Sequence, residues 1–261
     1  MSNRNDHADL KTDAAQNGWR SADEIEQIID MRYQKAIKHF EKIARGLLPR
    51  TCPICGYSGQ FSPVRHKVDV WCPSCDSRSR HRLIKLWAAK HFAAGKVGST
   101  LHFAAETCLT DMFRAASEEY VTADLNPGFD VQINIEDIDF PDASFDLVIA
   151  NHVLEHVRDE VALQELRRIL RPGGILLITV PIIEGWSTTF EDPGDMTRDR
   201  RALVMSDPDH RRWYGRDIRD KIREVGLTVS EFTAHEPDVT KYGIARGEKI
   251  FFGTVPRDAG N

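Results

Sequence analysis

Short apolar runs and helical stripes alternate along the second half of the chain. Residues 147–150 form a run of four apolar residues, typical of a strand buried on both faces. Residues 161–170 carry apolar side chains at helical spacing, and the sequence Pro-Gly-Gly at 172–174 ends that helix. Residues 175–180 predict a second buried strand. A strand, a helix and a strand with short links predict a parallel unit, whose ligands bind beyond the C-terminal strand ends.

Further elements are predicted on both sides of this unit. The predicted strands, with their adjoining loops, cover residues 100–106, 120–124, 131–134, 228–233 and 249–255, and the last two are antiparallel. Helices are predicted at 79–94 and 216–225, and a long loop at 234–247. The pattern therefore indicates an α/β fold built around a mostly parallel sheet.

The stretch Ser144 to Pro181 reads SFDLVIANHVLEHVRDEVALQELRRILRPGGILLITVP. It resembles the second half of a class I S-adenosylmethionine-dependent methyltransferase of the type 11 kind. The resemblance covers about Thr100 to Val255, and it implies a Rossmann-like sheet of order 3-2-1-4-5-7-6 with strand 7 antiparallel. It also implies an enzyme of class EC 2.1.1.-, whose cofactor is S-adenosylmethionine.

The loop after the first strand departs from the usual pattern of that family. Members usually place an acid and two glycines here, because the backbone must approach the cofactor closely. This chain has the sequence HFAAE over 102–106, where alanine is the next smallest residue. The segment resembles the LHFAPE variant of some zinc-knuckle methyltransferases, which also carry a later DHVR-x-YG motif. That resemblance extends from about Cys52 onward.

The resemblance also implies which residues bind the cofactor. Asp124 ends the second strand, where a carboxylate holds the two ribose hydroxyls. Asn134 stands where the family has an Asp, and its amide oxygen can accept from the adenine amino group. The implied cofactor-binding residues are His102, Phe103, Ala104, Glu106, Asp124, Leu125, Asn134, Ile135 and Asn151.

Two Cys-x-x-Cys pairs, Cys52 with Cys55 and Cys72 with Cys75, predict a metal site. Sixteen residues separate the pairs, a spacing typical of a four-thiolate zinc site. Four thiolates fill a tetrahedron and leave no open position, so we expect a structural zinc that folds a small knuckle. A rubredoxin-like iron and a redox-active pair are the alternatives.

Basic residues surround this predicted knuckle, and they allow two interpretations. They are Arg65, His66, Lys67, Arg78, Arg80, His81 and Arg82. One interpretation is a patch that contacts phosphate or RNA. The other, which we favour, is a solvated face whose basic side chains are attracted by the negative charge of a thiolate-bound zinc. Few aromatic residues lie among them.

Residues 182–212 follow the predicted fifth strand and show no clear periodicity. A polar insertion at the cofactor end is expected to recognise the acceptor, and a lid with solvated charges is the alternative. The sequence DHRRWYG at 209–215 concentrates a base, two guanidinium groups and two aromatic rings. We expect His210 or His152 to act as the catalytic base. The expected substrate-binding residues are Glu191, Arg211 and Tyr214.

The segment His152 to His156 also matches H-x-x-E-H, a zinc-protease pattern. That pattern needs a long helix and a distant third ligand, whereas here it follows a buried strand. We therefore interpret His152 as lining the methyl-transfer site, and His156 equally as a structural histidine.

Composition and charge narrow the picture further. The chain has 261 residues and a net charge of −5, so no overall basic field would recruit nucleic acid. No opening apolar stretch predicts a signal peptide and no apolar run is long enough to cross a bilayer, so we expect a cytoplasmic protein without membrane partners. A reducing compartment agrees with cysteines that bind metal.

Four segments are expected along the chain. They are a disordered tail (1–20), a helical arm (21–50), a zinc knuckle with its linking helix (51–97) and a methyltransferase domain (98–261). Ser21 and Glu24 form a capping box at the start of the arm. We expect the arm to pack against a core or to make a dimer contact.

Three functions fit these observations. The favoured one is methyl transfer from S-adenosylmethionine to a small-molecule or sugar-like (carbohydrate-type) acceptor. The second is an RNA methyltransferase whose knuckle grips the RNA, which the acidic composition disfavours. The third is a non-catalytic binding module, suggested by the missing glycines and disfavoured by Asp124, Asn151 and the Pro-Gly-Gly turn.

Overall fold

The computed structural model describes residues 21–46, 49–64, 67–93 and 95–257, in two compact units, Met1–Pro49 and Arg50–Asn261. In the first unit, helix α2 (Ala22–Gly46) begins with the predicted capping box. The Glu24 backbone N–H donates to Ser21 Oγ at 3.2 Å, and the Ser21 N–H donates to Glu24 Oε2 at 2.7 Å. The expected tail, 1–20, lies outside the described residues.

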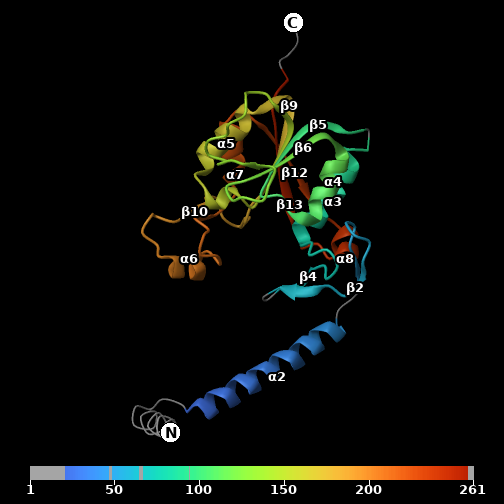
Figure 1. The fold of residues 1–261 in the computed structure, drawn as a ribbon, viewed down its shortest axis with the longest axis vertical. Helices are drawn as coiled ribbons and strands as arrows, with labels where there is room; N and C mark the ends of the chain where they lie inside the picture. Colours follow the sequence, from blue (N-terminus) through green and yellow to red (C-terminus); the bar gives the residue numbers. More distant parts are fainter. Residues whose placement is uncertain (1–20, 47–48, 65–66, 94, 258–261) are drawn as a thin grey trace, which may run out of the picture. The chain divides into compact units, whose positions relative to one another are not determined.

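A seven-stranded sheet organises the second unit (Figure 1). Its strands, in spatial order, are β7 (Val131–Gln132), β6 (Ser117–Asp124), β5 (Val97–Phe103), β8 (Phe145–Asn151), β9 (Leu170–Thr179), β13 (Lys249–Thr254) and β12 (Thr228–Thr233). The five strands from β7 to β9 are parallel, and β13 runs antiparallel to both of its neighbours. The predicted order and the antiparallel seventh strand are confirmed.

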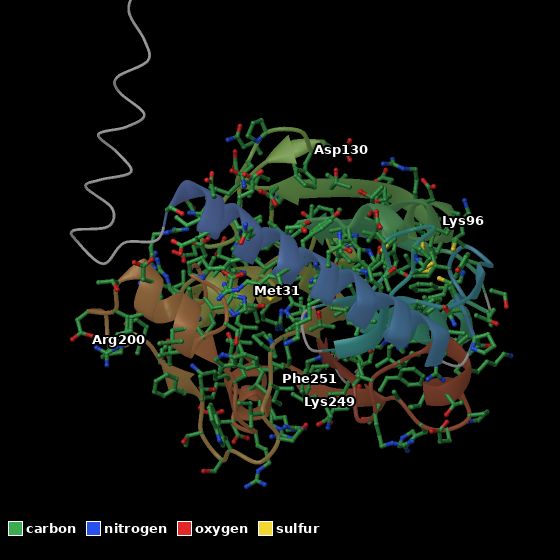
Figure 2. All side chains as sticks on the ribbon, turned by 90° about the horizontal axis from the view of Figure 1, so that it is seen from below. Met31, Lys96, Asp130, Arg200, Lys249 and Phe251 are labelled. Atoms are coloured by element: carbon green, nitrogen blue, oxygen red, sulfur yellow. The ribbon has the colours of Figure 1, made fainter. Side chains whose placement is uncertain are left out.

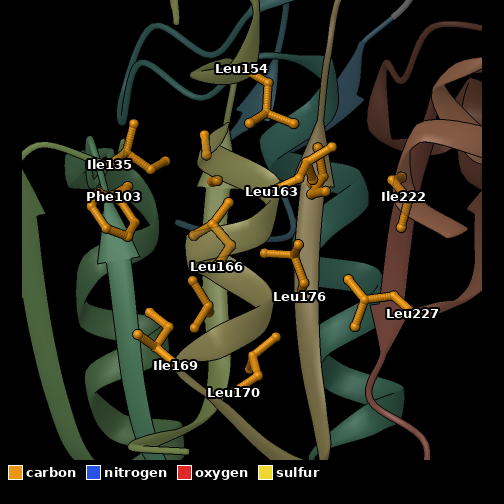
Figure 3. Packing of buried hydrophobic residues seen from close by; sticks show 14 of the residues in the cluster. Phe103, Ile135, Leu154, Leu163, Leu166, Ile169, Leu170, Leu176, Ile222 and Leu227 are labelled. Carbon is orange, nitrogen blue, oxygen red and sulfur yellow. The ribbon is translucent and has the colours of Figure 1, made fainter. Parts of the chain in front are cut away.

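Helices cover both faces of this sheet, as Figure 1 shows. One face carries α5 (Asp159–Arg168) and α7 (Ile218–Glu224), and the other carries α3 (Ser79–His91) and α4 (Thr107–Ala116). Leu163 and Leu166 of α5 lie beside Leu176 of β9 in a fully buried cluster (Figure 3). Burying each such leucine contributes roughly 1.5–3 kcal/mol, which explains why the central strands are apolar on both faces.

Two features of the structure differ from the sequence prediction: the position of the Pro-Gly-Gly turn and an additional short helix. Helix α5 ends at Arg168, and the Pro-Gly-Gly turn lies inside β9 rather than directly after the helix. The register between β8 and β9 shifts there, and Gly173 has φ of 80°, a conformation that favours glycine. Residues 234–247 were predicted as a loop, but they contain helix α8 (Asp238–Tyr242), whose Val239 packs into the core.

Short elements complete the unit around the two ends of the sheet. They are β1 (Arg50–Thr51), β2 (Ser58–Gly59), β3 (Ser62–Val64), β4 (Lys67–Trp71), the 3-10 helix η1 (Leu154–His156), β10 (Phe190–Glu191), α6 (Arg198–Val204) and β11 (Arg212–Trp213). The pairs β1 with β2, β3 with β4, and β10 with β11 are antiparallel ribbons. On β13, Lys249 and Phe251 share one face, because strand side chains alternate (Figure 2). No helix among the described residues is long and apolar enough to cross a membrane.

Candidate functional site

Three neighbouring strands end in register at one edge of the sheet. Phe103, the last residue of β5, lies opposite Ala123 of β6 and Ala150 of β8. The residues that follow are therefore Ala104, Asp124 and Asn151, which come from three separate segments of the chain. Because parallel strands direct their C-terminal ends to the same edge, these residues define the ligand edge of the sheet.

Ala104 begins the loop that lacks the usual glycines. Its φ is 48°, in the left-handed region, and its backbone N–H donates to Ala123 O at 2.8 Å. A residue other than glycine is strained in this conformation, which fits a turn that must pass close to a ligand. Alanine presents only a methyl group at this point, so the edge stays open despite the missing glycines.

Asp124 and its neighbours lie beside this loop and are partly exposed to solvent. Asp124 Oδ1 accepts from the Asn126 backbone N–H at 2.7 Å and from its side chain at 2.9 Å. Asp124 Oδ2 accepts no hydrogen bond from the described residues. Leu125 is 65% exposed, an apolar side chain at the ligand edge. Asn134 is exposed, whereas Ile135 is buried in the core below it.

Glu106 lies at the centre of a polar network behind the edge. Its Oε2 accepts from His102 Nε2 and from Asn151 Nδ2, both at 3.2 Å. His102 Nδ1 in turn accepts from the Tyr120 hydroxyl at 2.8 Å, which fixes the tautomer of the ring. Glu106 Oε1 lies 3.3 Å from His81 Nε2, but neither atom makes an aligned hydrogen bond within the described part of the chain.

The charges in this network follow from burial and contact. Burial alone would raise the pKa of the Glu106 carboxyl, but the hydrogen bond from His102 and the close contact with His81 hold that pKa well below its usual range. Burial lowers the pKa of His81, against the attraction of Glu106. The Glu106 carboxylate is therefore ionised at neutral pH, and its Oε1 remains an acceptor without a partner.

Two expected cofactor contacts need correction. His102 and Phe103 are 0% and 2% exposed, because their side chains are covered by the helices and loops on the two faces of the sheet. Neither can touch a bound cofactor through its side chain, and His102 instead positions Glu106. Asn151 is also buried, and its amide is bonded to Glu106 and Thr179.

A second cluster, the Glu155 cluster, combines Glu155, His152, His156 and His210. His152 directly follows β8 and has φ of 52°, and its Nδ1 donates to Glu155 Oε1 at 2.8 Å. That bond leaves His152 Nε2 as the nitrogen that can accept a proton. His210 Nε2 lies 3.9 Å from Glu155 Oε1, and the His156 and His210 rings are 4.8 Å apart. Burial lowers the pKa of His210.

The structure thus brings the two expected bases, His152 and His210, near the same oxygen of one carboxylate, Glu155 Oε1. Glu155 and His156 were not among the predicted site residues. The H-x-x-E-H pattern was their signal, but η1 is a single 3-10 turn, so the long helix of the protease pattern is absent from this stretch. His210 comes from a distant segment, and its position could not be derived from local pattern.

The segment 209–215 alternates between inward and outward residues. Arg212 is buried and donates to Glu191 Oε1 and to the carbonyl oxygens of Leu154 and Val157. Tyr214 is 0% exposed, and its hydroxyl donates to Asp159 Oδ2 at 3.1 Å. Direct substrate contact by Tyr214, as expected from the sequence, is therefore excluded in this conformation. Its role is to hold the segment against α5.

The outward residues of this segment line a polar cavity of about 610 Å³. Its lining residues are His156, Arg158, Glu191, Asp192, Gly194, Arg201, Asp209, Arg211 and Arg212. Arg158, Arg201 and Arg212 each pair with a carboxylate. Across the described ranges, Arg211 has no carboxylate within ion-pair distance. A cavity of this kind suits a polar ligand with an anionic or hydroxyl-rich group.

The four predicted metal ligands also come together. Cys52 Sγ lies 3.6 Å from Cys75 Sγ, and Cys55 Sγ lies 3.7 Å from Cys72 Sγ. Tetrahedral zinc with bonds near 2.3 Å sets sulfurs about 3.8 Å apart, so the set fits this ion. In both pairs the backbone closes a tight turn, through Gly56 N to Cys52 O and Asp76 N to Cys72 O.

The described basic residues near the cysteines differ in their exposure. His81 and Arg82 are 5% and 0% exposed. Burial lowers the pKa of Arg80, whose Nε is buried without a hydrogen-bond partner in the described structure. Residues 65 and 66 lie outside the described residues. Among the described members of this set, Arg78 is therefore exposed, whereas His81 and Arg82 are core residues.

Comparison with known proteins identifies a methyltransferase domain in part of the chain. Residues 92–178 match the family described as a methyltransferase domain. A segment of 94 residues is 36% identical to the ubiquinone/menaquinone biosynthesis C-methyltransferase UbiE of Escherichia coli. That match covers 34% of this chain and 38% of the relative's length.

Solved structures give a broader likeness. The [4+2]-cyclase SpnF superposes with a TM-score of 0.50 and 15% identity, over 68% of this chain and 82% of the other. The 1,6-didemethyltoxoflavin-N1-methyltransferase of Burkholderia thailandensis gives 0.49 and 13%, over 68% and 79%. The likeness to the cyclase shows a shared fold, and a shared fold alone does not assign the reaction.

Proposed function

We propose that the chain is an S-adenosylmethionine-dependent methyltransferase that acts on a small polar acceptor. The observation that carries this proposal is the register that sets Ala104, Asp124 and Asn151 at one edge of the sheet. The match of residues 92–178 to a methyltransferase domain supports the same chemistry. The polar cavity beside the edge favours an acceptor with hydroxyl or anionic groups, such as a sugar derivative.

The chain's own residues can hold the cofactor at this edge. S-adenosylmethionine, when bound, supplies an electrophilic methyl group on a positively charged sulfur. Asp124 Oδ2 accepts from the ribose hydroxyls, and exposed Leu125 offers an apolar surface to the adenine. Glu106 Oε1 is a buried, ionised acceptor without an aligned partner, which fits the ammonium group of the methionine part. Ala104 keeps the loop small where the ligand passes.

His152 is the base on the acceptor side. Its Nδ1–H is bonded to Glu155, so Nε2 takes the proton that a hydroxyl acceptor loses as it is methylated. Glu155 orients the ring and stabilises the imidazolium that forms. Arg211, which has no ion pair within the described residues, binds an anionic group of the acceptor. Positioning of donor and acceptor accounts for most of the rate, because methyl transfer is an in-line displacement.

We further propose a structural zinc at Cys52, Cys55, Cys72 and Cys75. The sulfur separations and the paired turns support this ion over a redox role. All four ligands come from the protein, so the zinc takes no part in the reaction.

Isotope-labelled S-adenosylmethionine tests the reaction directly. The purified protein is incubated with a panel of sugars, sugar nucleotides and RNA, and the products are examined by mass spectrometry. We expect label on a small acceptor. Turnover in His152→Ala should fall on the order of a hundredfold, as for a lost general base, with cofactor affinity unchanged. The matched control is His235→Ala, at an exposed histidine outside the site.

Two results would reject parts of this proposal. If calorimetry detects no binding of S-adenosylmethionine, the domain is a binding module rather than a methyltransferase. If the label appears on RNA and on none of the small molecules, the reaction stands but the acceptor class is wrong.

A further inference from the structure

Three side chains with metal-binding atoms meet beside the polar cavity: Glu155, His156 and His210. One ligand atom from each lies within 4.8 Å of the others. Glu155 and His156 belong to η1, whereas His210 precedes β11, so the set is assembled by the fold. We propose that these three residues bind a divalent ion of the first transition row, at a site distinct from the four cysteines.

Unpartnered buried atoms point to a missing cation. The Glu155 side chain is 0% exposed, and its Oε1 accepts from His152 Nδ1. Its Oε2 and His210 Nδ1 are buried and make no hydrogen bond to any described residue. A buried carboxylate oxygen without a partner is costly, and native structures seldom leave one. A cation next to Oε2 removes that cost.

The second histidine is already oriented for binding. His156 Nδ1 lies 3.2 Å from the carbonyl oxygen of Asp209, which can only accept, so Nδ1 carries the proton. The lone pair of His156 is then on Nε2. Histidine ligands of metal ions commonly donate their other N–H to a carbonyl or carboxylate, which fixes tautomer and direction. His156 therefore has the outer contact expected of a ligand.

Hydrogen bonds to backbone carbonyl oxygens of η1 hold the two contributing segments together. The Arg211 N–H donates to Glu155 O at 2.8 Å, and Arg212 Nη1 donates to Leu154 O at 2.9 Å. Ligand atoms around an ion with bonds of about 2.1 Å are about 3.4 Å apart in a tetrahedron. The ligand atoms, which lie within 4.8 Å of one another, therefore need to approach by at most about 1.4 Å to bind one ion.

The donor set selects the kind of ion. Two imidazoles and one carboxylate suit Zn²⁺, Mn²⁺, Fe²⁺ or Co²⁺, whereas Mg²⁺ and Ca²⁺ prefer oxygen ligands. Three protein ligands leave an open coordination position, in contrast to the closed four-cysteine set. His156 lines the cavity, so that open position faces the space proposed for the acceptor. An acceptor hydroxyl or carboxylate would be the natural fourth ligand.

Cobalt binding tests the site independently of any methyl transfer. Full-length protein with its cysteine-bound metal in place is titrated with Co²⁺, followed by calorimetry and visible absorption. We expect one further equivalent, with weak ligand-field bands and no new thiolate charge-transfer band. His156→Ala and His210→Ala should each lower the Co²⁺ affinity about tenfold or more. His235→Ala, at an exposed histidine, should bind as the wild type does.

The inference fails if the wild-type protein takes up no second equivalent, or if both variants bind Co²⁺ as tightly as wild type. Either result would leave the Glu155 cluster as a hydrogen-bonded relay only. Circular dichroism and retention of the cysteine-bound metal check that the variants fold. If the variants do not fold, the number of Co²⁺ equivalents bound by the wild-type protein tests the proposed site. His152→Ala separates the two proposals, because it removes the base but none of the three ligands.

Discussion

Two glutamates, the half-buried Glu106 and the buried Glu155, show how single residues define this site. Each is an ionised carboxylate whose pKa is held below its usual range although burial alone would raise it, because a hydrogen bond from a histidine outweighs the burial. Each also keeps one oxygen without an aligned partner. Glu106 is bonded to Asn151 at the ligand edge, and Glu155 belongs to η1, whose His156 lines the cavity. Each of the two carboxylates thus offers an oxygen that can bind a separate positively charged group.

Asp124 tests the cofactor edge at the level of one side chain. Asp124→Ala removes a charged acceptor of hydrogen bonds, which contributes roughly 1.5–3 kcal/mol. We therefore expect S-adenosylmethionine to bind about tenfold to a hundredfold more weakly, as measured by calorimetry. Asp111→Ala, at an exposed acid on α4, is the control and should leave affinity unchanged. Equal affinity in Asp124→Ala and wild type would move the ribose contact elsewhere.

Tyr214 tests whether the 209–215 segment is held from within. Tyr214→Phe deletes the hydroxyl bonded to buried Asp159, so the free energy of unfolding should fall by about 1–3 kcal/mol in urea denaturation. The KM for an acceptor should stay near the wild-type value, because the ring has no exposed surface. Tyr57→Phe is the control, since its hydroxyl bonds an exposed carbonyl. A raised KM with unchanged stability would instead return Tyr214 to the acceptor site.

At the scale of elements, the strands were predictable and the site was only partly so. Continuous apolar runs such as Leu147 to Ala150 are found on β8 because both faces of a central strand are covered. Helix α8 was missed because five residues show too little periodicity. The cofactor edge followed from strand ends, whereas the Glu155 cluster joins residues far apart in sequence. Local pattern carries no information on such a long-range contact.

An ion-pair network across α7, β12 and β13 gives an element-scale prediction. Glu231 accepts from Arg219 and Lys249, and Glu184 contacts the same two cations. The hydrogen bond from Arg219 lowers the pKa of Glu231. Burial alone would raise the pKa of Glu184, but its bonds to Arg219 and Lys249 lower it. Both carboxylates are therefore more acidic in the folded state than in the unfolded chain.

The sign of the pH effect follows from those directions. The network stabilises the fold above the unfolded glutamate pKa of about 4.3, and that stability is lost as pH falls through the lower folded values. Glu231→Gln should lower the free energy of unfolding at neutral pH by less than about 1 kcal/mol, because the groups are partly exposed. The variant should also lose less of its free energy of unfolding than the wild type does when the pH is lowered. Glu224→Gln, on α7 without a described partner, should behave as wild type. An identical pH profile for Glu231→Gln and wild type would contradict the linkage.

At the scale of the whole second unit, one buried arginine joins the cysteine region to the sheet domain. Arg82 of α3 donates to the carbonyl oxygens of Ser77 and Val70 on the cysteine side. It also donates to those of Tyr242 and Gly243, next to α8. Its guanidinium carbon lies 4.6 Å from the Phe61 ring centre. A buried cation with four carbonyl partners makes the two parts depend on each other, because separation would leave it unpaired.

Metal removal should therefore unfold more than the knuckle. Without zinc, the thiols of Cys52, Cys55, Cys72 and Cys75 lose the ion that draws their two turns together, and Arg82 loses a fixed set of acceptors. We expect one zinc per chain by elemental analysis. Chelation, or Cys72→Ser, should lower the unfolding temperature of the whole unit on the order of 10 °C, in a single calorimetric transition. Cys108→Ser, outside the cluster, should keep its metal. A metal-free protein with an unchanged main transition, or with a separate low-temperature transition for the knuckle, would show that Arg82 does not couple the two parts.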